Sequence, residues 1–380
     1  MRIGIDARFY GSVGKGLGRY TSELIAHLEK ADTGNDYVVF LRKSNFDEYV
    51  PGNPRFAKAL AEFPWYGWRE QVLYPLWLRK FRLDLMHFPH FNVPILYRRP
   101  FVVTVHDLIL LSHPTARATT LGPLAYWVKF RLYLLVIGRA IADAAAVITV
   151  SEFTKKEIIG RFPSAKQKDI VVTYEACATT LRGKSGDAPR PDVTKPFALY
   201  VGNAYPHKNL ERLLAAFAKF RADGHAGWRL VLVGAEDYFY GRLKDEAREK
   251  RLDANVTFFG HATDRELSSL YDAASFYAFP SLCEGFGLPP LEAMCHGLPV
   301  ASSKACCLPE ILDDAARYFD PGDEDDMARA FAEVADDAGL RESLAAKGGA
   351  RAATFDWMRC ARMTKAVYDK ALTKTTHGHA

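Results

Sequence analysis

The 380-residue sequence has no apolar run long enough to cross a membrane. A spanning helix needs about 20 predominantly apolar residues, and the best run here, residues 132–137, lies between Arg131 and Arg139. The first ten residues, MRIGIDARFY, carry charges where a secretory signal would have its apolar segment. These absences predict a cytoplasmic chain that reaches, at most, the inner face of the plasma membrane.

Cysteine is scarce as well, with 6 in the chain. None has the spacing of a zinc site, and two are adjacent, Cys306 and Cys307. In a cytosolic protein this usage predicts reduced thiols and no cysteine-bound metal.

The net charge of +5 is unevenly spread. Residues 1–180 contain 24 Lys and Arg against 16 Asp and Glu, and the remainder contains 26 against 29, so the two parts carry +8 and −3. A basic first half suits an anionic membrane or a phosphate-bearing acceptor, although ordinary variation between domains explains the asymmetry equally well. No segment combines aromatic and basic residues in the pattern of a nucleic-acid site, so no nucleic-acid partner is expected.

Two stretches, 65–82 and 126–139, are both basic and aromatic. This composition suits a membrane interface. Core helices whose basic side chains reach out to water explain it nearly as well.

Apolar runs typical of strands alternate with helical stretches, which predicts an α/β architecture with parallel sheets. A loop rich in glycine, proline and charge divides the runs into two series, so we expect two Rossmann-like, doubly wound domains, 1–178 and 179–356. Residues 357–372 are expected to form an amphipathic helix and 373–380 a disordered tail. The predicted strands are 2–6, 37–41, 85–88, 101–105, 146–150 and 170–172, then 197–201, 229–233, 256–259, 276–279 and 299–301.

The most informative segment is FPSLCEGFGLPPLEAMCHGLPV, residues 279–300. After a strand comes a loop with Glu284, Gly285 and Gly287; two prolines then mark a helix start, with Glu292 one turn in. Glycines let the backbone approach a ligand, and a helix start offers free N–H groups to an anion. Carboxylates repel phosphate, so the two glutamates are expected to accept hydrogen bonds from hydroxyls. A nucleotide-sugar, with phosphates between two hydroxyl-rich groups, fits this layout.

This segment, with seven residues between its two glutamates, resembles the signature of retaining glycosyltransferases of family 4, which have the GT-B fold. The resemblance covers nearly the whole chain and is most specific between residues 201 and 310. It implies two domains facing a central cleft, with acceptor bound mostly by the first, nucleotide-sugar mostly by the second, and helix 357–372 crossing back to the first.

The resemblance also implies roles for the residues of this segment. Glu292 would hold the ribose hydroxyls of the donor, and Glu284 would hold the hydroxyls of the transferred sugar. The sugar and phosphates would meet the backbone of four consecutive residues, Gly285, Phe286, Gly287 and Leu288.

Residues 201–210, VGNAYPHKNL, follow a predicted strand and open a helix. Lys208 is the strongest candidate for stabilising the departing diphosphate, because a bound anion offsets the unfavourable dipole that a cation meets at a helix start. Gly202 is expected to lie against the donor. Many relatives have an arginine shortly after this glycine as a second phosphate clamp. This chain has Asn203 at that position, so either His207 contacts the phosphates together with Lys208 or Lys208 is the sole phosphate clamp.

The strand 101–105 ends in His106 and Asp107, at the edge where parallel sheets bind ligands. The resemblance implies that His106 contacts the donor sugar, so we count it with Lys208 and Glu284 as catalytic. Asp107 is expected to cap the next turn.

Residues 11–20, GSVGKGLGRY, form a glycine-rich turn after the first strand. A dinucleotide site is the rival explanation, but the spacing misses the GxGxxG fingerprint and no acid ends the second strand. The resemblance implies instead a loop in which Gly16 touches the donor phosphates. Lys15 and Arg19 would face the acceptor, although solvated surface charge explains both equally well.

Residues 85–94, LMHFPHFNVP, place His87 and His90 at another strand end. Two histidines without a third ligand nearby do not make a metal site. We interpret both as part of the acceptor-side wall.

The combined prediction is retaining transfer of a hexose from a nucleotide-sugar to a hydroxyl of a glycan or lipid-linked acceptor. The segments HFPHFNVP and VGNAYPHKN resemble bacterial mannosyltransferases of cell-surface polysaccharide assembly, so GDP-mannose is the expected donor. Rhamnosyl, glucosyl and N-acetylglucosaminyl transfer use nearly the same framework and remain open. A nucleotide-sugar epimerase and a non-catalytic sugar-binding protein have less support. No Asp-x-Asp motif ends a strand, and the acids at 323–326 are expected in a solvated loop, so no metal cofactor is expected.

Overall fold

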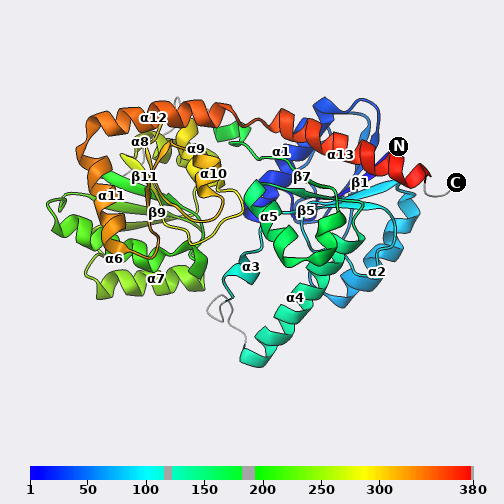
Figure 1. Cartoon of the computed structure of the whole chain (residues 1–380), viewed down its shortest axis with the longest axis horizontal. Helices are drawn as coiled ribbons and strands as arrows, with labels where there is room; N and C mark the ends of the chain where they lie inside the picture. Colours follow the sequence, from blue (N-terminus) through cyan, green and yellow to red (C-terminus); the bar gives the residue numbers. More distant parts are fainter. Residues whose placement is uncertain (115–121, 182–192, 378–380) are drawn as a thin grey trace. The chain divides into compact units, whose positions relative to one another are not determined.

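In this computed structural model, residues 1–114, 122–181 and 193–377 are described, and they form two compact units (Figure 1). The first unit comprises residues 1–108, 121–175 and 356–380, and the second comprises 109–120 and 176–355. The described residues 109–114 and 176–178, which the sequence analysis counted with the first domain, therefore group with the second. None of the described helices is both long enough and apolar enough to span a membrane.

The first unit is built on a seven-stranded parallel sheet with the order β3-β2-β1-β4-β5-β6-β7. Parallel strands need crossover connections, and the helices that make them cover the sheet. Except for the edge strand β3, the strands are almost entirely buried and carry the apolar runs that the sequence shows. They are β1 (Arg2–Asp6), β2 (Asp36–Leu41), β3 (Phe56–Leu60), β4 (Leu85–Phe88), β5 (Phe101–Val105), β6 (Ala146–Thr149) and β7 (Ile170–Val172).

The helices of the first unit include α13, which comes from the far end of the chain and packs against α1. They are α1 (Lys15–Ala31), α2 (Trp68–Leu78), α4 (Pro123–Asp143), α5 (Glu152–Arg161) and α13 (Trp357–His377), with 3-10 turns η1 (Gly11–Gly14), η2 (Arg79–Phe81) and η4 (Pro163–Gln167).

The second unit has a six-stranded parallel sheet with the order β10-β9-β8-β11-β12-β13. Because β8, β11 and β12 are neighbours, the loops that follow them leave the same edge of the sheet. The strands are β8 (Phe197–Val201), β9 (Arg229–Val233), β10 (Val256–Gly260), β11 (Phe276–Phe279), β12 (Val300–Ser303) and β13 (Ala316–Phe319).

Several helices of the second unit begin at side-chain caps. Thr263 and Glu266 form a reciprocal capping box at α8, and Asp237 caps α7. The elements are α3 (Ile109–Ser112), α6 (Leu210–Ala222), α7 (Tyr238–Glu249), α8 (Asp264–Ala273), α9 (Leu288–Cys295), α10 (Leu308–Leu312), α11 (Glu324–Asp336) and α12 (Ala338–Ala353), with η5 (Thr179–Leu181) and η6 (Pro206–Lys208).

Four local predictions need correction. The strands β3 and β13 were missed because both lie at sheet edges, where one side of the strand is partly exposed and the apolar run is broken. The acids 323–326 do not form a loop. Asp323 caps α11 and the others occupy its first turn, where the helix dipole stabilises carboxylates. Helix α13 continues to His377, because extending an existing helix costs far less than starting one. Only residues 378–380 of the expected tail lie outside the described residues.

Buried polar groups join α13 to the first sheet. His87 in β4 is fully buried, with Nδ1 2.6 Å from the Tyr368 hydroxyl of α13 and Nε2 2.8 Å from Oγ1 of Thr104 in β5. Burial, with a smaller contribution from the nearby His106, lowers the pKa of His87 to about 3. His87 is therefore neutral at physiological pH and links three elements by hydrogen bonds.

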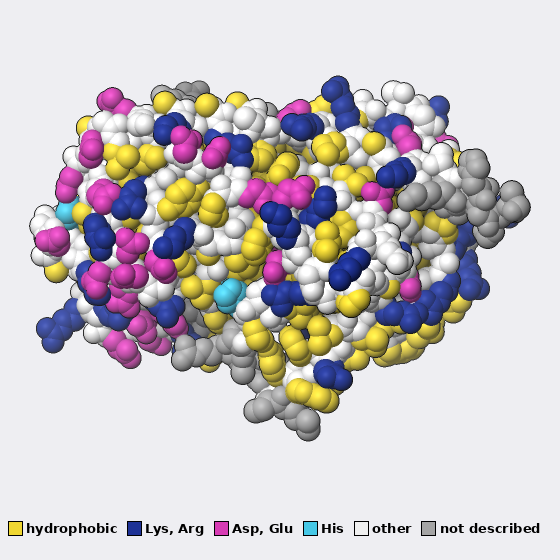
Figure 2. Space-filling model, in the orientation of Figure 1, with side chains coloured by type: hydrophobic (Ala, Val, Ile, Leu, Met, Phe, Trp, Pro, Cys, Tyr) yellow, Lys and Arg dark blue, Asp and Glu magenta, His cyan; other side chains and the backbone are white. Residues whose placement is uncertain are grey.

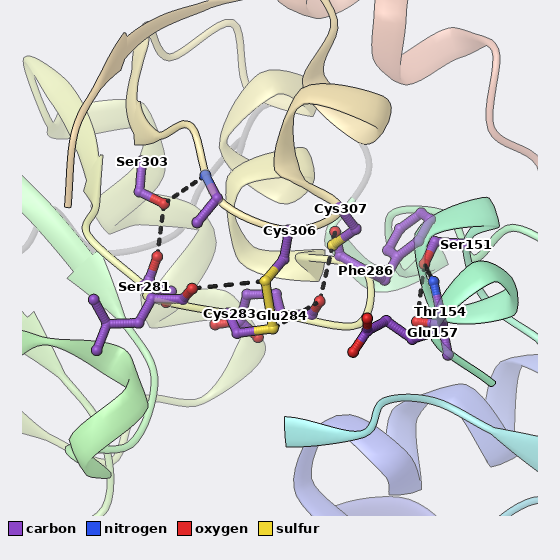
Figure 3. The surroundings of a disulfide bond; sticks show 12 residues. Ser151, Thr154, Glu157, Ser281, Cys283, Glu284, Phe286, Ser303, Cys306 and Cys307 are labelled. Atoms are coloured by element: carbon purple, nitrogen blue, oxygen red, sulfur yellow. Dashed lines mark hydrogen bonds between the residues drawn. A yellow bond between two sulfur atoms is a disulfide. The ribbon is translucent and has the colours of Figure 1, made fainter. Parts of the chain in front are cut away.

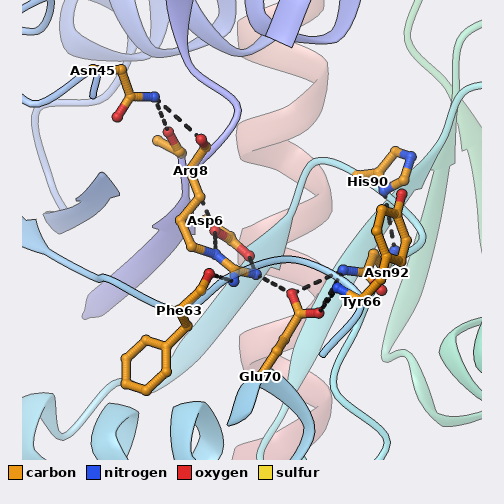
Figure 4. A network of polar contacts seen from close by, with 9 residues as sticks. Asp6, Arg8, Asn45, Phe63, Tyr66, Glu70, His90 and Asn92 are labelled. Carbon is orange, nitrogen blue, oxygen red and sulfur yellow. Dashed lines mark hydrogen bonds and ion pairs between the residues drawn. The ribbon is translucent and has the colours of Figure 1, made fainter. Parts of the chain in front are cut away.

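A second buried network surrounds Arg8, directly after β1 (Figure 4). Its guanidinium donates to both oxygens of Asp6 and to Oε1 of Glu70, each at 2.7 Å, and to the carbonyl of Phe63 at 3.0 Å. Asn92 donates to both oxygens of Glu70, at 2.8 and 2.9 Å. Burial raises the pKa of Glu70, and the contacts with Arg8 and Asn92 oppose that rise. Removing one charge from such a network is expected to be costly, because its partner would be left buried and unpaired.

The depressed pKa of His87 predicts a specific acid sensitivity. Below about 6.5 the unfolded chain binds a proton at His87 that the folded chain refuses, so stability falls as pH drops from 6.5 towards 3. Between pH 7.5 and 5.5 the free energy of unfolding should fall by about 1.4 kcal/mol less in His87→Gln than in the wild type. This difference is independent of any stability that the variant loses at pH 7.5 because its hydrogen bonds are changed. Urea unfolding at the two pH values measures the difference, with the exposed His261→Gln as control. An unchanged pH dependence in His87→Gln would show that His87 is protonated in the folded state.

Candidate functional site

Helix α9 begins directly after the loop that follows β11. Gly287 precedes its first residue with φ +97°, and a Cβ there would meet Cδ2 of Leu308 at 2.9 Å, so glycine is needed on both counts. The two prolines lie in the first turn, and Gly297 follows the helix with φ +69°. The predicted helix start and stop are confirmed.

The side chain of Phe286 is buried, with its ring 5.6 Å from that of Phe355 in an edge-to-face contact. This segment can therefore offer a ligand its backbone, while the phenyl ring holds the loop in place.

Glu284 lies in this loop and pairs with Lys208. The Lys208 Nζ donates to Oε1 of Glu284 at 2.6 Å, and both side chains are largely buried. Burial acts to raise the pKa of the Glu284 carboxyl, but the charge of Lys208 and its hydrogen bond outweigh that effect, so the pKa is lowered. The structure thus brings together two residues that the sequence analysis assigned to different parts of a ligand.

Glu292 lies in α9 and is 2% exposed. Its Oε2 accepts a hydrogen bond from the Tyr271 hydroxyl of α8 at 3.0 Å. This bond orients the carboxylate. Sequence reasoning missed Tyr271, because only the packing of α8 beside α9 places the two side chains together.

The loop after β8 is folded around Gly202, whose φ is +154° and whose carbonyl accepts from the Tyr240 hydroxyl at 2.8 Å. A Cβ on Gly202 would lie 2.6 Å from the Tyr200 hydroxyl, so glycine is required for space. The same hydroxyl of Tyr200 donates to the carbonyl of Asn203, and the Asn203 side chain accepts from the amide of Tyr205. Asn203 therefore shapes the loop.

His207 has a carbonyl that accepts from the amide of Leu282 at 2.8 Å, which joins the β8 loop to the β11 loop. Burial and the neighbouring Lys208 lower the pKa of its imidazole to about 4. At neutral pH His207 is uncharged, so Lys208 carries the positive charge of this loop.

Asn209, which sequence reasoning did not single out, strengthens the same junction. It has φ +62°, and its side-chain amide donates to the carbonyls of Pro280 at 3.0 Å and Pro321 at 2.8 Å. Asparagine tolerates this left-handed conformation better than most residues. The sequence signal that could have identified Asn209 is its position one residue after Lys208.

The cysteines near the site differ from the prediction (Figure 3). Cys283 and Cys306 form a disulfide, so the expectation of reduced thiols is wrong for this pair. They are 23 residues apart in sequence, but the adjacent strands β11 and β12 bring their loops together, with Cα atoms 5.3 Å apart. Cys307 points the other way and donates to the carbonyls of Glu284 at 3.2 Å and Phe286 at 3.3 Å.

His106 in the first unit has both ring nitrogens close to acceptors. Nδ1 lies 3.1 Å from Oε1 of Glu175, and Nε2 lies 2.9 Å from the carbonyl of Pro89. Burial acts to lower its pKa, but the hydrogen bond and charge of Glu175 outweigh it and the pKa is raised. Only the protonated ring donates to both partners at once. Glu175 is a buried partner that the sequence analysis missed, since nothing near residue 175 marks it.

The remaining predicted residues of the first unit are less favourably placed. His87 is fully buried between β5 and α13, so the prediction of an acceptor-side wall is wrong for this residue. Successive side chains of a strand point to opposite faces of the sheet, and the face on which His87 lies is covered. His90 is half-buried, accepts from the amide of Asn92 and packs against the rings of Phe9 and Phe91 at tilted angles. Its pKa is lowered to about 3, mainly by burial.

The glycine-rich turn forms η1 and the first turn of α1. Gly16 is exposed, and a Cβ there would meet nothing within 4 Å, so no steric demand for glycine is evident. Arg19 is half-buried. The side chain of Lys15 lies outside the described residues.

Comparison with known proteins places this chain in a family. Residues 14–179 match the family model described as Glycosyltransferase Family 4, and residues 184–351 match the one described as Glycosyl transferases group 1. The O-antigen chain mannosyltransferase B of Escherichia coli is 28% identical over 376 residues, which are 93% of this chain and 95% of that protein.

Solved structures agree on the fold. The sucrose-phosphate synthase of Thermosynechococcus elongatus superposes with a TM-score of 0.77 at 19% identity, covering 98% of this chain and 100% of the other. The Anabaena protein Alr3699/HepE, solved in complex with UDP and glucose, superposes with a TM-score of 0.71 at 17% identity, covering 97% and 99%. Two Rossmann-like units with parallel sheets, together with family matches over most of the chain, establish that this protein belongs to the glycosyltransferases of family 4 and has the GT-B fold.

Proposed function

We propose that this glycosyltransferase moves a mannose from GDP-mannose to a hydroxyl of a glycan or lipid-linked acceptor, with retention of the anomeric configuration, in the assembly of a cell-surface polysaccharide. The observation that carries the proposal is the pair of buried carboxylates, Glu284 and Glu292, on either side of the α9 N-terminus, with Lys208 beside the first. Acids on both sides of an anion-binding helix start suit a diphosphate that has a hydroxyl-rich group at each end.

The roles follow from the chemistry of each group. Glu292, oriented by Tyr271, accepts hydrogen bonds from the ribose hydroxyls. Glu284 accepts from hydroxyls of the transferred sugar. Pro289 and Pro290 have no N–H, so at the α9 start the amides of Gly287 and Leu288 are the ones that face the phosphates.

Lys208 supplies the positive charge for the departing diphosphate. Without a ligand its ammonium pairs with Glu284. A diphosphate brings more negative charge than one carboxylate, so Lys208 turns to it, and Glu284 is released to the sugar hydroxyls. In this scheme the ammonium and the helix dipole stabilise the leaving group and no metal ion is required.

The donor sugar is supported by similarity and not by any residue on its own. The relative named a mannosyltransferase spans nearly the whole chain, at 28% identity. The acceptor class rests on the same relative, whose name refers to the O-antigen chain. A transfer assay with a panel of GDP- and UDP-sugars and lipid-linked acceptors tests both. Transfer from a UDP-sugar alone would refute the GDP-mannose assignment but leave the transferase reaction intact.

Glu292→Ala should weaken binding of the free nucleoside diphosphate, because it removes the acceptor of the ribose hydroxyls. Each charge-assisted hydrogen bond is worth about 1.5–3 kcal/mol, so a loss of roughly 10- to 100-fold in affinity is expected. Glu284→Gln should leave this affinity nearly unchanged while it lowers turnover. Isothermal titration calorimetry with GDP measures the first effect, with the exposed Glu249→Ala as a matched control. Equal losses in the two variants would contradict the division of roles.

Lys208→Met should reduce turnover by about two to three orders of magnitude, the usual loss when a preorganised charge stabiliser is removed. Methionine preserves the length and packing of the side chain and removes only the charge. Steady-state rates at saturating donor isolate this effect, with Lys347→Met on the surface of the same unit as control. Turnover within a factor of three of the wild type would exclude Lys208 from leaving-group stabilisation.

We also propose that α4 docks the protein on an anionic membrane. On one face of this helix Val128, Leu132 and Leu135 are 44–54% exposed, at spacings of four and three residues, with Trp127 beside them at 57%. The exposed basic residues of α4 are Lys129, Arg131 and Arg139. Figure 2 shows hydrophobic and basic side chains mixed over α4 and over α2. The expectation that residues 126–139 form a core helix thus holds only for its opposite face, where Tyr133 and Ile137 are buried.

Binding to vesicles that contain anionic lipid should weaken as salt rises, because exposed charges are screened within about 10 Å at 0.1 M. It should not vanish, since the apolar face adds a contribution that salt does not screen. The double variant Trp127→Ser/Leu132→Ser should lose binding at low and high salt, whereas Tyr238→Ser, an exposed aromatic residue of the second unit, should not. Co-sedimentation measures both. Absence of binding at low salt, or equal binding by the double variant, would refute docking through α4.

A further inference from the structure

Three potential metal ligands converge beside Glu284 from three separate segments. Cys283 follows β11, Cys306 follows β12, and His113 follows the short helix α3. Their ligand atoms, two Sγ and one imidazole nitrogen, all lie within 4.8 Å of one another. Among the described residues this is the only such group of three or more His, Cys, Asp or Glu side chains.

We propose that reduced Cys283 and Cys306, together with His113, bind one soft divalent cation, of which Zn²⁺ is the fitting example. Thiolate and imidazole are the preferred ligands of zinc, at about 2.3 and 2.0–2.1 Å. Tetrahedral bonds of these lengths place the ligand atoms about 3.5–3.8 Å apart. Reduction of the disulfide lets its two sulfurs separate to that distance, and the imidazole nitrogen lies within 4.8 Å of both. Three protein ligands leave a fourth position for water, as in sites of the Cys₂His type.

The disulfide is the alternative state of the same two cysteines. Its formation from the thiols releases two protons and two electrons, and a small disulfide such as oxidised glutathione accepts the electrons as it is reduced to two thiols. A disulfide sulfur has no thiolate charge to offer a cation, so oxidation removes two of the three ligands. Conversely, binding of the cation releases the thiol protons and protects both sulfurs from oxidation.

The site would restrain the loop that carries Glu284. Cys283 is the preceding residue, so a cation held by Cys283 and Cys306 fastens the β11 loop to the β12 loop, as the disulfide does. His113 adds a contact that the disulfide lacks, because it fastens residues 109–114 to the same point. The two states therefore differ in how this segment is held. The cation is separate from the leaving-group chemistry assigned to Lys208, and its binding does not depend on the proposed reaction.

The test uses the full-length protein, reduced with a phosphine, freed of reductant under argon and titrated with Co²⁺, whose bonds to thiolate give an intense near-ultraviolet charge-transfer band. We expect one equivalent to bind and Zn²⁺ to displace it. The band should be absent in protein oxidised with glutathione disulfide. It should be lost in Cys283→Ser and Cys306→Ser, and His113→Ala should weaken binding by at least the roughly 10-fold that losing even a supporting group costs.

Matched controls separate the site from general effects of substitution. Cys295→Ser, a cysteine outside the disulfide, and His261→Ala, an exposed histidine of the same unit, should bind Co²⁺ like the wild type. Circular dichroism of each variant confirms that it is folded. Absence of the band in the reduced wild type, or its full retention in Cys306→Ser, would overturn the proposal. Unchanged affinity in His113→Ala would remove His113 from the site.

Discussion

The candidate site depends on the pairing of β8 with β11 in the second sheet. Parallel strands that are neighbours send the loops at their carboxyl ends to the same edge, which is why Lys208 meets Glu284 at 2.6 Å although 76 residues separate them. The amide of Leu282 and the side chain of Asn209 then fasten the two loops by hydrogen bonds. Without that strand order, neither the Lys208–Glu284 pair nor the hydrogen bonds between the two loops would form.

Charges buried in this protein are held in pairs or networks, and that arrangement decides their protonation. Lys208 lowers the pKa of Glu284, and Glu175 raises the pKa of His106, each against the effect of burial. His87 and His207 lack a carboxylate that outweighs burial, and their pKa values fall to about 3 and 4. Histidines that look alike in the sequence therefore have pKa values shifted in opposite directions.

Much of the fold could be predicted from the chain because parallel strands buried on both faces leave continuous apolar runs. Such runs marked β1, β4 and β5 to the residue, whereas the half-exposed edge strands β3 and β13 left no comparable signal. The family, too, was accessible, because the spacing of Glu284 and Glu292 around a glycine-rich helix start is a local pattern. Features of this kind depend only on residues that are close together in the sequence, so they can be predicted from it.

The partners of those residues were decided only by tertiary structure. Tyr271 beside Glu292, Glu175 beside His106 and Tyr368 on His87 come from elements distant in sequence, and no local pattern marks them. The pairing of Cys283 with Cys306 depends on β11 lying next to β12. The sequence by itself determined the strands, the turns and the chemical groups at the ends of strands. Which of those groups meet, and with what charge, was decided by packing, because burial and contact depend on distances in space and not on spacing along the chain.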